Sequence, residues 1–131
     1  MINFFSKHNL IFYIINFSLI FLYLFPGSLV GYLIYGNIKI QPQITPNFFI
    51  SSNHFYVFIL LSTIGFLTFK KKKLITYLTF YLIILSIILE ILHIFIPERS
   101  FEWSDLFGNF LGVIIVIFIR NLINKHEFIK K

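Results

Sequence analysis

The stretch that decides the fold is 74–96, LITYLTFYLIILSIILEILHIFI, in which Glu90 is the one acidic residue and no lysine or arginine occurs. A helix needs about 20 mostly apolar residues to cross the hydrocarbon core of a bilayer, and this run is long enough. Backbone polar groups in lipid must be hydrogen-bonded within the chain, so a spanning run of this kind folds as a helix. The stretch therefore predicts a transmembrane helix.

Three further apolar runs lie around it, at 10–25, 53–69 and 105–123. The last has weaker hydropathy because Asn109 and two glycines interrupt it. No run shows the repeated ten-residue alternation of polar and apolar positions that barrel strands require. The sequence predicts an all-α polytopic membrane protein, a bundle of four transmembrane helices in a single domain of residues 1–131.

The composition supports the same class of protein. Hydrophobic residues make up 58% of the chain and charged residues 12%, whereas soluble domains average about 25% charged residues. A water-soluble domain of this size buries only part of its surface, so it could not hide so much apolar area. Cysteine is absent, which excludes a disulfide scaffold and thiol chemistry.

The net charge is +6, and the basic residues are not spread along the chain but cluster at the ends of the apolar runs. This clustering is typical of membrane orientation, because cytoplasmic loops carry an excess of lysine and arginine, and it argues against nucleic-acid binding. With four spans, nine of the basic residues lie on one side and two, Lys39 and Arg99, on the other: the nine are Lys7, Lys70, Lys71, Lys72, Lys73, Arg120, Lys125, Lys130 and Lys131. Both termini are therefore expected in the cytoplasm, in a multi-pass protein of the inner membrane.

The segment from the first run to the second leaves two questions open. Lys7 and the run 10–25 resemble a secretory signal peptide, but Pro26-Gly27-Ser28 is not an A-x-A cleavage site, so a retained span is favoured. The apolar stretch 29–35 is too short to span. It either extends the first helix beyond a proline kink or lies in the membrane interface, where tyrosine is favoured.

Function is expected in the stretch 90–112, EILHIFIPERSFEWSDLFGNFLG, which holds every acidic residue except Glu127. Glu90 and His93 are three apart and share a helix face. Glu90 lies about two helical turns before Pro97, which at 1.5 Å per residue places it roughly 10 Å into the bilayer. A bare carboxylate there costs about 2.5–3.5 kcal/mol, so Glu90 is expected to be paired, protonated or near water. Arg99, the nearest basic residue in the sequence, is the expected partner.

The second half of this stretch begins the fourth helix. Pro97 ends the third helix, and the short loop that follows makes the two helices antiparallel neighbours. Ser104 is the expected N-cap, and Asp105 in the first turn suits the helix dipole. Asp105, Asn109 and Gly112 share one face at i, i+4 and i+7. Gly108 and Gly112 form a G-x-x-x-G spacing that permits close approach of another helix, and Trp103 fits an interfacial anchor.

A polar pocket at the outer surface is the candidate site, since His54 begins the second helix at the same level. Its six residues are His54, Glu90, His93, Arg99, Asp105 and Asn109. Each also has a structural explanation: Asp105 as a cap residue, Asn109 as a bond between helices, and a histidine as an interfacial side chain. Glu90-x-x-His93 has the spacing found in carboxylate-bridged metal bundles, but it occurs only once. No metal or cofactor is expected.

An ordered set of short motifs resembles the VanZ-like family of small bacterial membrane proteins. The motifs are His54-Phe55, Glu90 with His93, Pro97-Glu98-Arg99-Ser100, and the segment 105–112, DLFGNFLG. The resemblance covers about residues 10–120. The family often has Gln in place of His93 and Asp-Lys just before the His-Phe pair, where this chain has Ser51-Ser52-Asn53. Membership would imply a role in the bacterial cell envelope, and the founding member is associated with low-level resistance to the glycopeptide antibiotic teicoplanin.

Two functions follow from these observations. The first is a non-enzymatic envelope protein whose pocket binds a lipid head group, a lipid-linked precursor or a protein partner. The second is a small membrane enzyme on such a lipid, in which Glu90 or His54 acts as general base and Arg99 holds a phosphate. A monomeric transporter is disfavoured because repeat halves and broken helices are absent, whereas a pore formed by an oligomer stays open. The sequence leaves both catalysis and the oligomeric state undecided.

Overall fold

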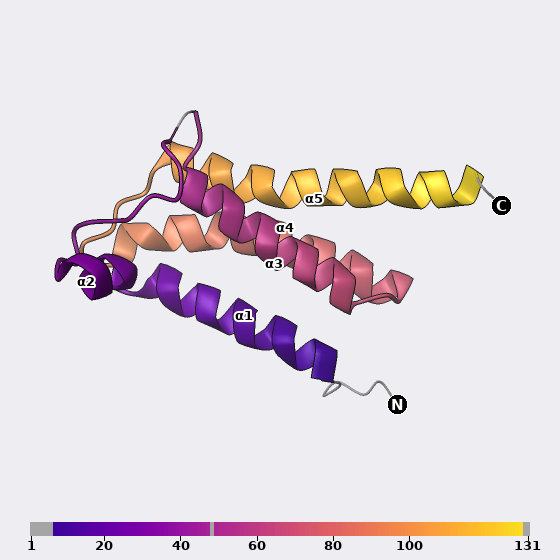
Figure 1. Cartoon of the computed structure of the whole chain (residues 1–131), viewed down its shortest axis with the longest axis horizontal. Helices are drawn as coiled ribbons and strands as arrows, with labels where there is room; N and C mark the ends of the chain where they lie inside the picture. Colours follow the sequence, from indigo (N-terminus) through magenta and orange to yellow (C-terminus); the bar gives the residue numbers. More distant parts are fainter. Residues whose placement is uncertain (1–6, 48, 130–131) are drawn as a thin grey trace.

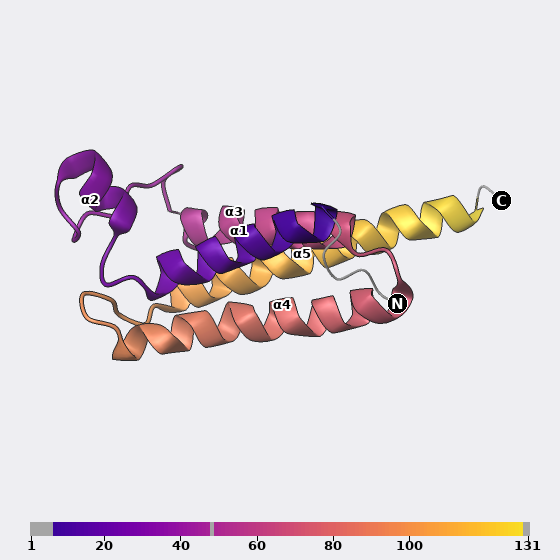
Figure 2. The ribbon, with the colours of Figure 1, turned by 90° about the horizontal axis from the view of Figure 1, so that it is seen from below.

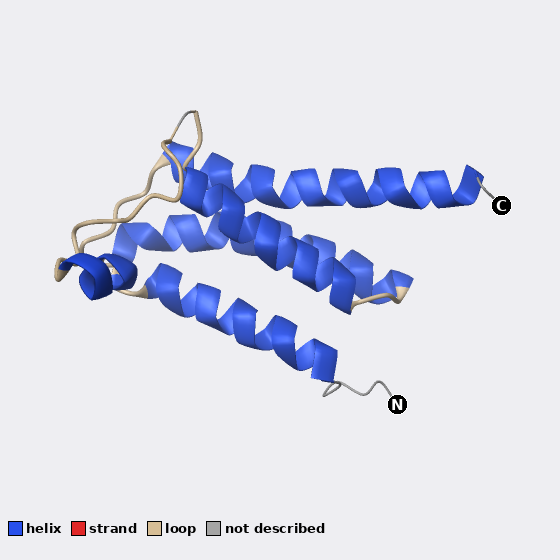
Figure 3. Cartoon of the chain, in the orientation of Figure 1, coloured by secondary structure: helices blue, strands red, loops and turns tan. Residues whose placement is uncertain are grey.

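The chain folds into a bundle of helices, as the sequence predicts. A computed structural model describes residues 7–47 and 49–129, with the side chains of 9–47 and 49–126. Within these residues the structure is helical with no strand, as Figure 3 shows. The helices are α1 (Lys7–Leu24), α2 (Leu29–Tyr35), α3 (Ser52–Thr68), α4 (Lys72–Leu92) and α5 (Trp103–Ile129), with a 3₁₀ turn at His93–Phe95.

The four longer helices alternate in direction. The start of α1, the end of α5 and the tight turn between α3 and α4 lie at one end of the bundle, and the long loops lie at the other (Figure 1). Figure 2 shows α4 and α5 side by side and antiparallel, as expected from the short loop that joins them. The lysines of 70–73 are thus separated from the acidic end, where Glu90, Glu98, Glu102 and Asp105 lie. Lys130 and Lys131 lie outside the described residues.

Two helices are long and apolar enough to cross a membrane, Lys72–Phe95 and Trp103–His126. A third candidate results if α1 and α2 are counted as one bent span. Helix α3 is apolar but has only 17 residues. The chain thus has the features of a helical membrane protein by length and composition.

Apolar side chains cover much of the outside of these two helices. Only 39% of the apolar window of α4 and 28% of that of α5 are buried inside the structure. Side chains such as Phe80 and Phe118 are more than half exposed. Such continuous apolar faces are unfavourable in water and are compatible with lipid or with other membrane helices.

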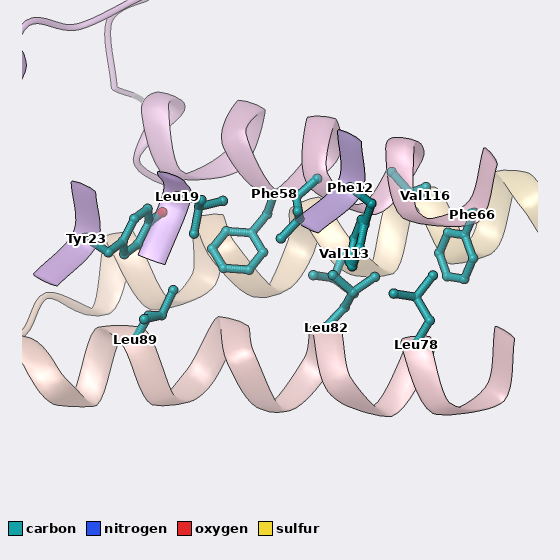
Figure 4. Close-up of a cluster of buried hydrophobic side chains, with 11 residues drawn as sticks. Phe12, Leu19, Tyr23, Phe58, Phe66, Leu78, Leu82, Leu89, Val113 and Val116 are labelled. Atoms are coloured by element: carbon teal, nitrogen blue, oxygen red, sulfur yellow. The ribbon is translucent and has the colours of Figure 1, made fainter. Parts of the chain in front are cut away.

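The core lies where α1, α3, α4 and α5 meet. Figure 4 shows its side chains in a line between the helices, from Tyr23 and Leu89 at one end to Phe66 and Leu78 at the other. Phe58, Leu61, Leu82 and Val113 are fully buried, so all but the first helix contribute a residue without solvent exposure. This core fixes the separation and the tilt of the helices that carry the polar side chains.

Two glycines bring α5 into direct contact with α3. A Cβ atom on Gly108 would lie 2.8 Å from the backbone oxygen of Ser51, and one on Gly112 would lie 2.7 Å from that of Phe55. Both distances are too short for a real side chain. The predicted close approach at the G-x-x-x-G spacing is therefore confirmed, with α3 as the partner helix.

A sharp bend separates helix α2 from α1. The two helices meet at 79° across the break at 25–28. Gly27 has φ +73°, which favours glycine, and the Ser28 hydroxyl accepts a hydrogen bond from the Gly31 N–H at 2.9 Å and caps α2. The bend excludes a straight continuation of α1, and both alternatives for 29–35, a bent extension of the first span and an interfacial helix, stay open.

The predicted N-cap of the fourth helix is wrong. Helix α5 begins at Trp103, one residue before Ser104. The carbonyl of Glu102 accepts hydrogen bonds from the N–H groups of Asp105 and Leu106, both at 3.1 Å. Glu102 is held there because its own N–H bonds to Glu90, an interaction between elements that the local capping pattern does not contain. Asp105 does lie in the first turn, as expected.

Candidate functional site

A buried group of polar side chains lies at the acidic end, between the C-terminal ends of α1 and α4 and the N-terminal ends of α3 and α5. We call it the polar cluster, and it consists of Tyr23, His54, Glu90, His93, Asp105 and Asn109. Five of the six residues were expected from the sequence, and the structure brings these five together. Arg99 lies elsewhere, and Tyr23 was not expected.

His54 is the centre of the polar cluster. It is buried, and its Nε2 atom lies 3.2 Å from Oδ2 of Asp105. Its Nδ1 atom lies 3.1 Å from Oδ1 of Asn109 and 3.1 Å from the hydroxyl of Tyr23. Both ring nitrogens therefore have polar neighbours, and residues from α1, α3 and α5 meet at this imidazole.

The hydrogen bonds of Asn109 fix the orientation of its side-chain amide. Its Nδ2 group donates to the backbone carbonyl of Ser86 at 3.3 Å, so Oδ1 faces the histidine. The Tyr23 hydroxyl donates to this same Oδ1 atom at 2.7 Å. Asn109 is completely buried, and it links α5 to α1, α3 and α4. The structural explanation of Asn109 as a bond between helices is thus correct, and it also orients His54.

Glu90 is completely buried although it carries a carboxylate. One oxygen, Oε1, accepts a hydrogen bond from the backbone N–H of Glu102 at 3.0 Å. The other, Oε2, lies 3.3 Å from Nδ1 of His93 and 3.9 Å from Nδ1 of His54. Oε2 makes no hydrogen bond of acceptable geometry. Its electrostatic partners are the two histidines.

His93 lies beside Glu90 on the inner side of the cluster. Its Nε2 atom is 3.1 Å from the backbone carbonyl of Tyr23. A carbonyl only accepts hydrogen bonds, so this contact assigns a hydrogen to Nε2. Its Nδ1 atom then faces the carboxylate of Glu90, as expected from the i, i+3 spacing.

The predicted pairing of Arg99 with Glu90 is wrong. The Arg99 side chain donates from Nε to the carbonyl of Phe25 at 3.3 Å and from Nη2 to that of Leu22 at 3.1 Å. It binds the C-terminal end of α1, where a positive charge also suits the helix dipole. Partial burial lowers the pKa of Arg99. Proximity in the sequence was misleading here because the end of α1 packs next to the loop.

Tyr23 is the residue that sequence reasoning missed. It is buried, its hydroxyl bonds to Asn109, and its ring stacks on that of His93 with centroids 5.8 Å apart. In the sequence it resembles Tyr32 and Tyr35, which are exposed. A tyrosine near the end of an apolar run is equally typical of an interfacial residue, so no local signal separates these three.

A cavity of about 420 Å³ lies next to the polar cluster. Tyr23, His54 and Arg99 lie in its wall, so it reaches the cluster from the side of α1 and α3. The remaining wall is mostly apolar and comes from α1, α2, α3 and the loop before α3: Leu19, Leu22, Ser28, Leu29, Val30, Ile34, Gln41, Pro42, Gln43, Ile44, Asn53 and Val57. Of the two candidate bases, His54 borders the cavity and Glu90 does not.

Three side chains of the cluster have the arrangement of metal ligands. One ligand atom each from His54, Glu90 and Asp105 lies within 4.8 Å of the others. Each residue comes from a different helix. Chemically the site can therefore accept and donate protons at His54, attract an anion at Arg99, or bind a cation between the two carboxylates.

Comparison of the chain with protein-family models, with curated proteins and with solved structures gave no match. The functional argument therefore rests on the site itself.

Proposed function

We propose that this chain is a multi-pass protein of the bacterial inner membrane with four spans and both termini in the cytoplasm. The alternating helices and the lysine-rich turn at 70–73 support this orientation. Helix α3 has 17 residues, which is the short end of the spanning lengths of about 17–25 residues. The acidic end, with the cavity and the polar cluster, then faces outward.

We further propose that the chain belongs to the VanZ-like family. The support is that the residues of its motifs are neighbours in space and not only ordered in sequence. His54, Glu90, Asp105 and Asn109 all belong to the polar cluster. Such membership would imply a role in the bacterial cell envelope, in a family whose founding member is associated with teicoplanin resistance.

The function that the site supports best is binding of an anionic lipid head group, either of a phospholipid or of a lipid-linked envelope precursor. The observation that carries this proposal is the composition of the cavity wall. Apolar side chains from α1, α2 and α3 suit acyl or isoprenyl chains, and Arg99 and His54 suit an anionic group. A membrane protein partner is the remaining alternative as a ligand of the same surface.

Arg99 has donors left for such a ligand. Its two hydrogen bonds use Nε and Nη2, and a guanidinium carries five N–H groups in all. Planar forks of this kind bind phosphate and carboxylate groups with two parallel hydrogen bonds. Arg99 can therefore hold the end of α1 and an anionic head group together.

Native mass spectrometry of the purified chain with phosphatidylglycerol and with phosphatidylcholine tests this proposal. We expect a preference for the anionic lipid that Arg99→Gln weakens about tenfold, in line with loss of about 1.4 kcal/mol from a charged hydrogen bond. Lys39→Gln is the matched control, because Lys39 is an exposed cation of the same end that contacts Glu98 and does not border the cavity. Equal losses in the two variants, at unchanged helicity, would contradict the proposal.

The alternative is a small membrane enzyme that acts on a phospholipid or a lipid-linked cell-wall intermediate. One contact favours it: His54 borders the cavity, and its Nε2 atom lies 3.2 Å from the carboxylate of Asp105. A carboxylate in that position orients an imidazole and stabilises its protonated form when it acts as general base. Turnover of a radiolabelled lipid-linked precursor by the purified chain, lost in His54→Gln, would favour the enzyme over simple binding.

A further inference from the structure

The charge balance inside the polar cluster is unusual. Glu90 and Asp105 both carry carboxylates, and the ion pairs that they form among the described residues are with histidines only. Arg99 is directed to the end of α1, and Lys39 contacts Glu98 at the surface. Two buried or half-buried carboxylates therefore have no lysine or arginine of the described residues at ion-pair distance, and Arg99 attracts them only from farther away.

The hydrogen bonds of His54 sharpen this point. Asn109 presents Oδ1 to Nδ1 because its Nδ2 group is held by the carbonyl of Ser86, so Nδ1 carries the hydrogen of a neutral imidazole. The lone pair of Nε2 then points at Oδ2 of Asp105 from 3.2 Å. Two electron-rich atoms stay that close only with a cation between or beside them, either a proton or a metal ion.

An independent observation comes from Glu90. Its Oε2 atom is fully buried, lacks a hydrogen bond, and lies 3.9 Å from Nδ1 of His54. Buried side-chain oxygens normally have a hydrogen-bond partner, so an orphaned carboxylate oxygen is expected to coordinate something. The other oxygen of Glu90 is fixed by the Glu102 N–H, which holds Oε2 in this direction.

We propose that His54, Glu90 and Asp105 bind a divalent transition-metal ion, with Zn²⁺ as the preferred occupant. In tetrahedral zinc sites with bonds of about 2.0–2.1 Å, neighbouring ligand atoms lie about 3.3 Å apart. Nε2 of His54 and Oδ2 of Asp105 are already at 3.2 Å, and one ligand atom from each of the three residues lies within 4.8 Å of the others. An imidazole ligand favours zinc over magnesium or calcium, which prefer oxygen ligands alone.

The surroundings of these ligands match those of known types of metal site. A metal-bound histidine usually donates its other ring N–H to a carbonyl or carboxylate, and Asn109 Oδ1 accepts that bond from His54. Three protein ligands leave one position of a tetrahedral ion open, which is the pattern of catalytic rather than structural zinc. Because His54 also borders the cavity, a head-group phosphate there could take this position. That last step alone rests on the proposed lipid binding.

Metal content of the full-length chain, purified in detergent and dialysed with Zn²⁺, tests the proposal directly. We expect about one zinc ion per chain by elemental mass spectrometry. Asp105→Asn and Glu90→Gln should each lower zinc affinity at least about tenfold. Glu98→Gln is the matched control, since Glu98 is an acid of the same end outside the cluster, and it should retain the metal.

A second measurement does not depend on whether the variants fold. Co²⁺ added to the metal-free wild-type chain should give visible absorption bands that Zn²⁺ removes, because four-coordinate sites of this ligand type bind both ions. Absence of these bands, together with zinc well below one ion per chain, would overturn the proposal and identify protons as the cations of the cluster. Lipid binding measured in the presence of a chelator separates the two ideas. Its survival without metal leaves head-group binding intact, and zinc binding in lipid-free detergent supports the metal site on its own.

Discussion

At the scale of single residues, the polar cluster shows how an apolar bundle accommodates polar groups. Each member contacts at least one other helix, and the amide of Asn109 alone connects to α1, α3 and α4. Leaving a buried polar group without a hydrogen-bond partner costs more free energy than the bond itself contributes. Removing one member of the cluster therefore also destabilises the partners that it leaves unbonded. Glu90 Oε2 departs from this pattern, and the metal-site proposal is based on it.

Asn109→Leu should destabilise the chain more than any other single loss of an amide. It removes the acceptor of Tyr23 and His54 and the donor to Ser86, so about 1–3 kcal/mol of unfolding free energy is expected to be lost. Unfolding in SDS, followed by circular dichroism, measures this. Asn16→Leu is the control, because Asn16 accepts one bond from Tyr81 at an exposed site, and a loss of only about 0.6 kcal/mol is expected. Equal losses would mean that the cluster contributes no special stability.

At the scale of the elements, the contact between α3 and α5 positions the site. Gly108 and Gly112 let the two backbones touch. Asn109 follows Gly108 in the sequence, and His54 lies across the contact from Gly108. The distance between the helices therefore fixes the distance between the imidazole and its partners. The bend after α1 has a comparable role, because it places α2 over the cavity rather than along the axis of α1.

Gly112→Val should separate α5 from α3. A Cβ atom at position 112 meets the backbone oxygen of Phe55 at 2.7 Å, and backbone cannot move aside as a side chain can. Overpacking of this kind typically costs about 1–3 kcal/mol, and we expect a lower thermal unfolding midpoint together with weaker metal and lipid binding. Ile119→Phe adds bulk to an exposed face of the same helix and should change neither property. A stable Gly112→Val variant with unchanged binding would argue against control of the site by this contact.

At the scale of the whole molecule, charge is divided between the two ends of the bundle. The lysines of 70–73, the start of α1 and the end of α5 are at one end, and the polar cluster and cavity are at the other. Because lysine-rich loops are retained in the cytoplasm, this division predicts a site that is open to the outer leaflet. An outward site suits ligands of the cell envelope.

Single cysteines test this orientation without interference, since the chain has none of its own. Glu102→Cys and Lys72→Cys both replace exposed side chains at opposite ends. We expect a membrane-impermeant maleimide to label position 102 in intact cells and position 72 only after permeabilisation. The reverse pattern would place the site in the cytoplasm and would exclude a ligand of the outer leaflet.

The sequence by itself determined the helices and their order. Apolar run length and the lysine turn at 70–73 are properties of neighbouring residues, so they predicted α1, α3, α4 and α5, although α5 continues to Ile129, six residues beyond the predicted end of the run. Helical spacing also placed Glu90 beside His93 and Asp105 on the face of Asn109, since i, i+3 and i+4 positions meet on any helix. Their convergence with His54 followed from alternating helix direction alone.

Only the tertiary structure decided which polar groups became partners. Arg99 bonds to the end of α1 instead of Glu90, and Tyr23 enters the polar cluster from a run that resembles ordinary lipid-facing sequence. These contacts depend on the rotation of each helix about its axis and on how closely α5 approaches α3. Both are set by side-chain packing between distant segments, which hydropathy and local spacing do not encode.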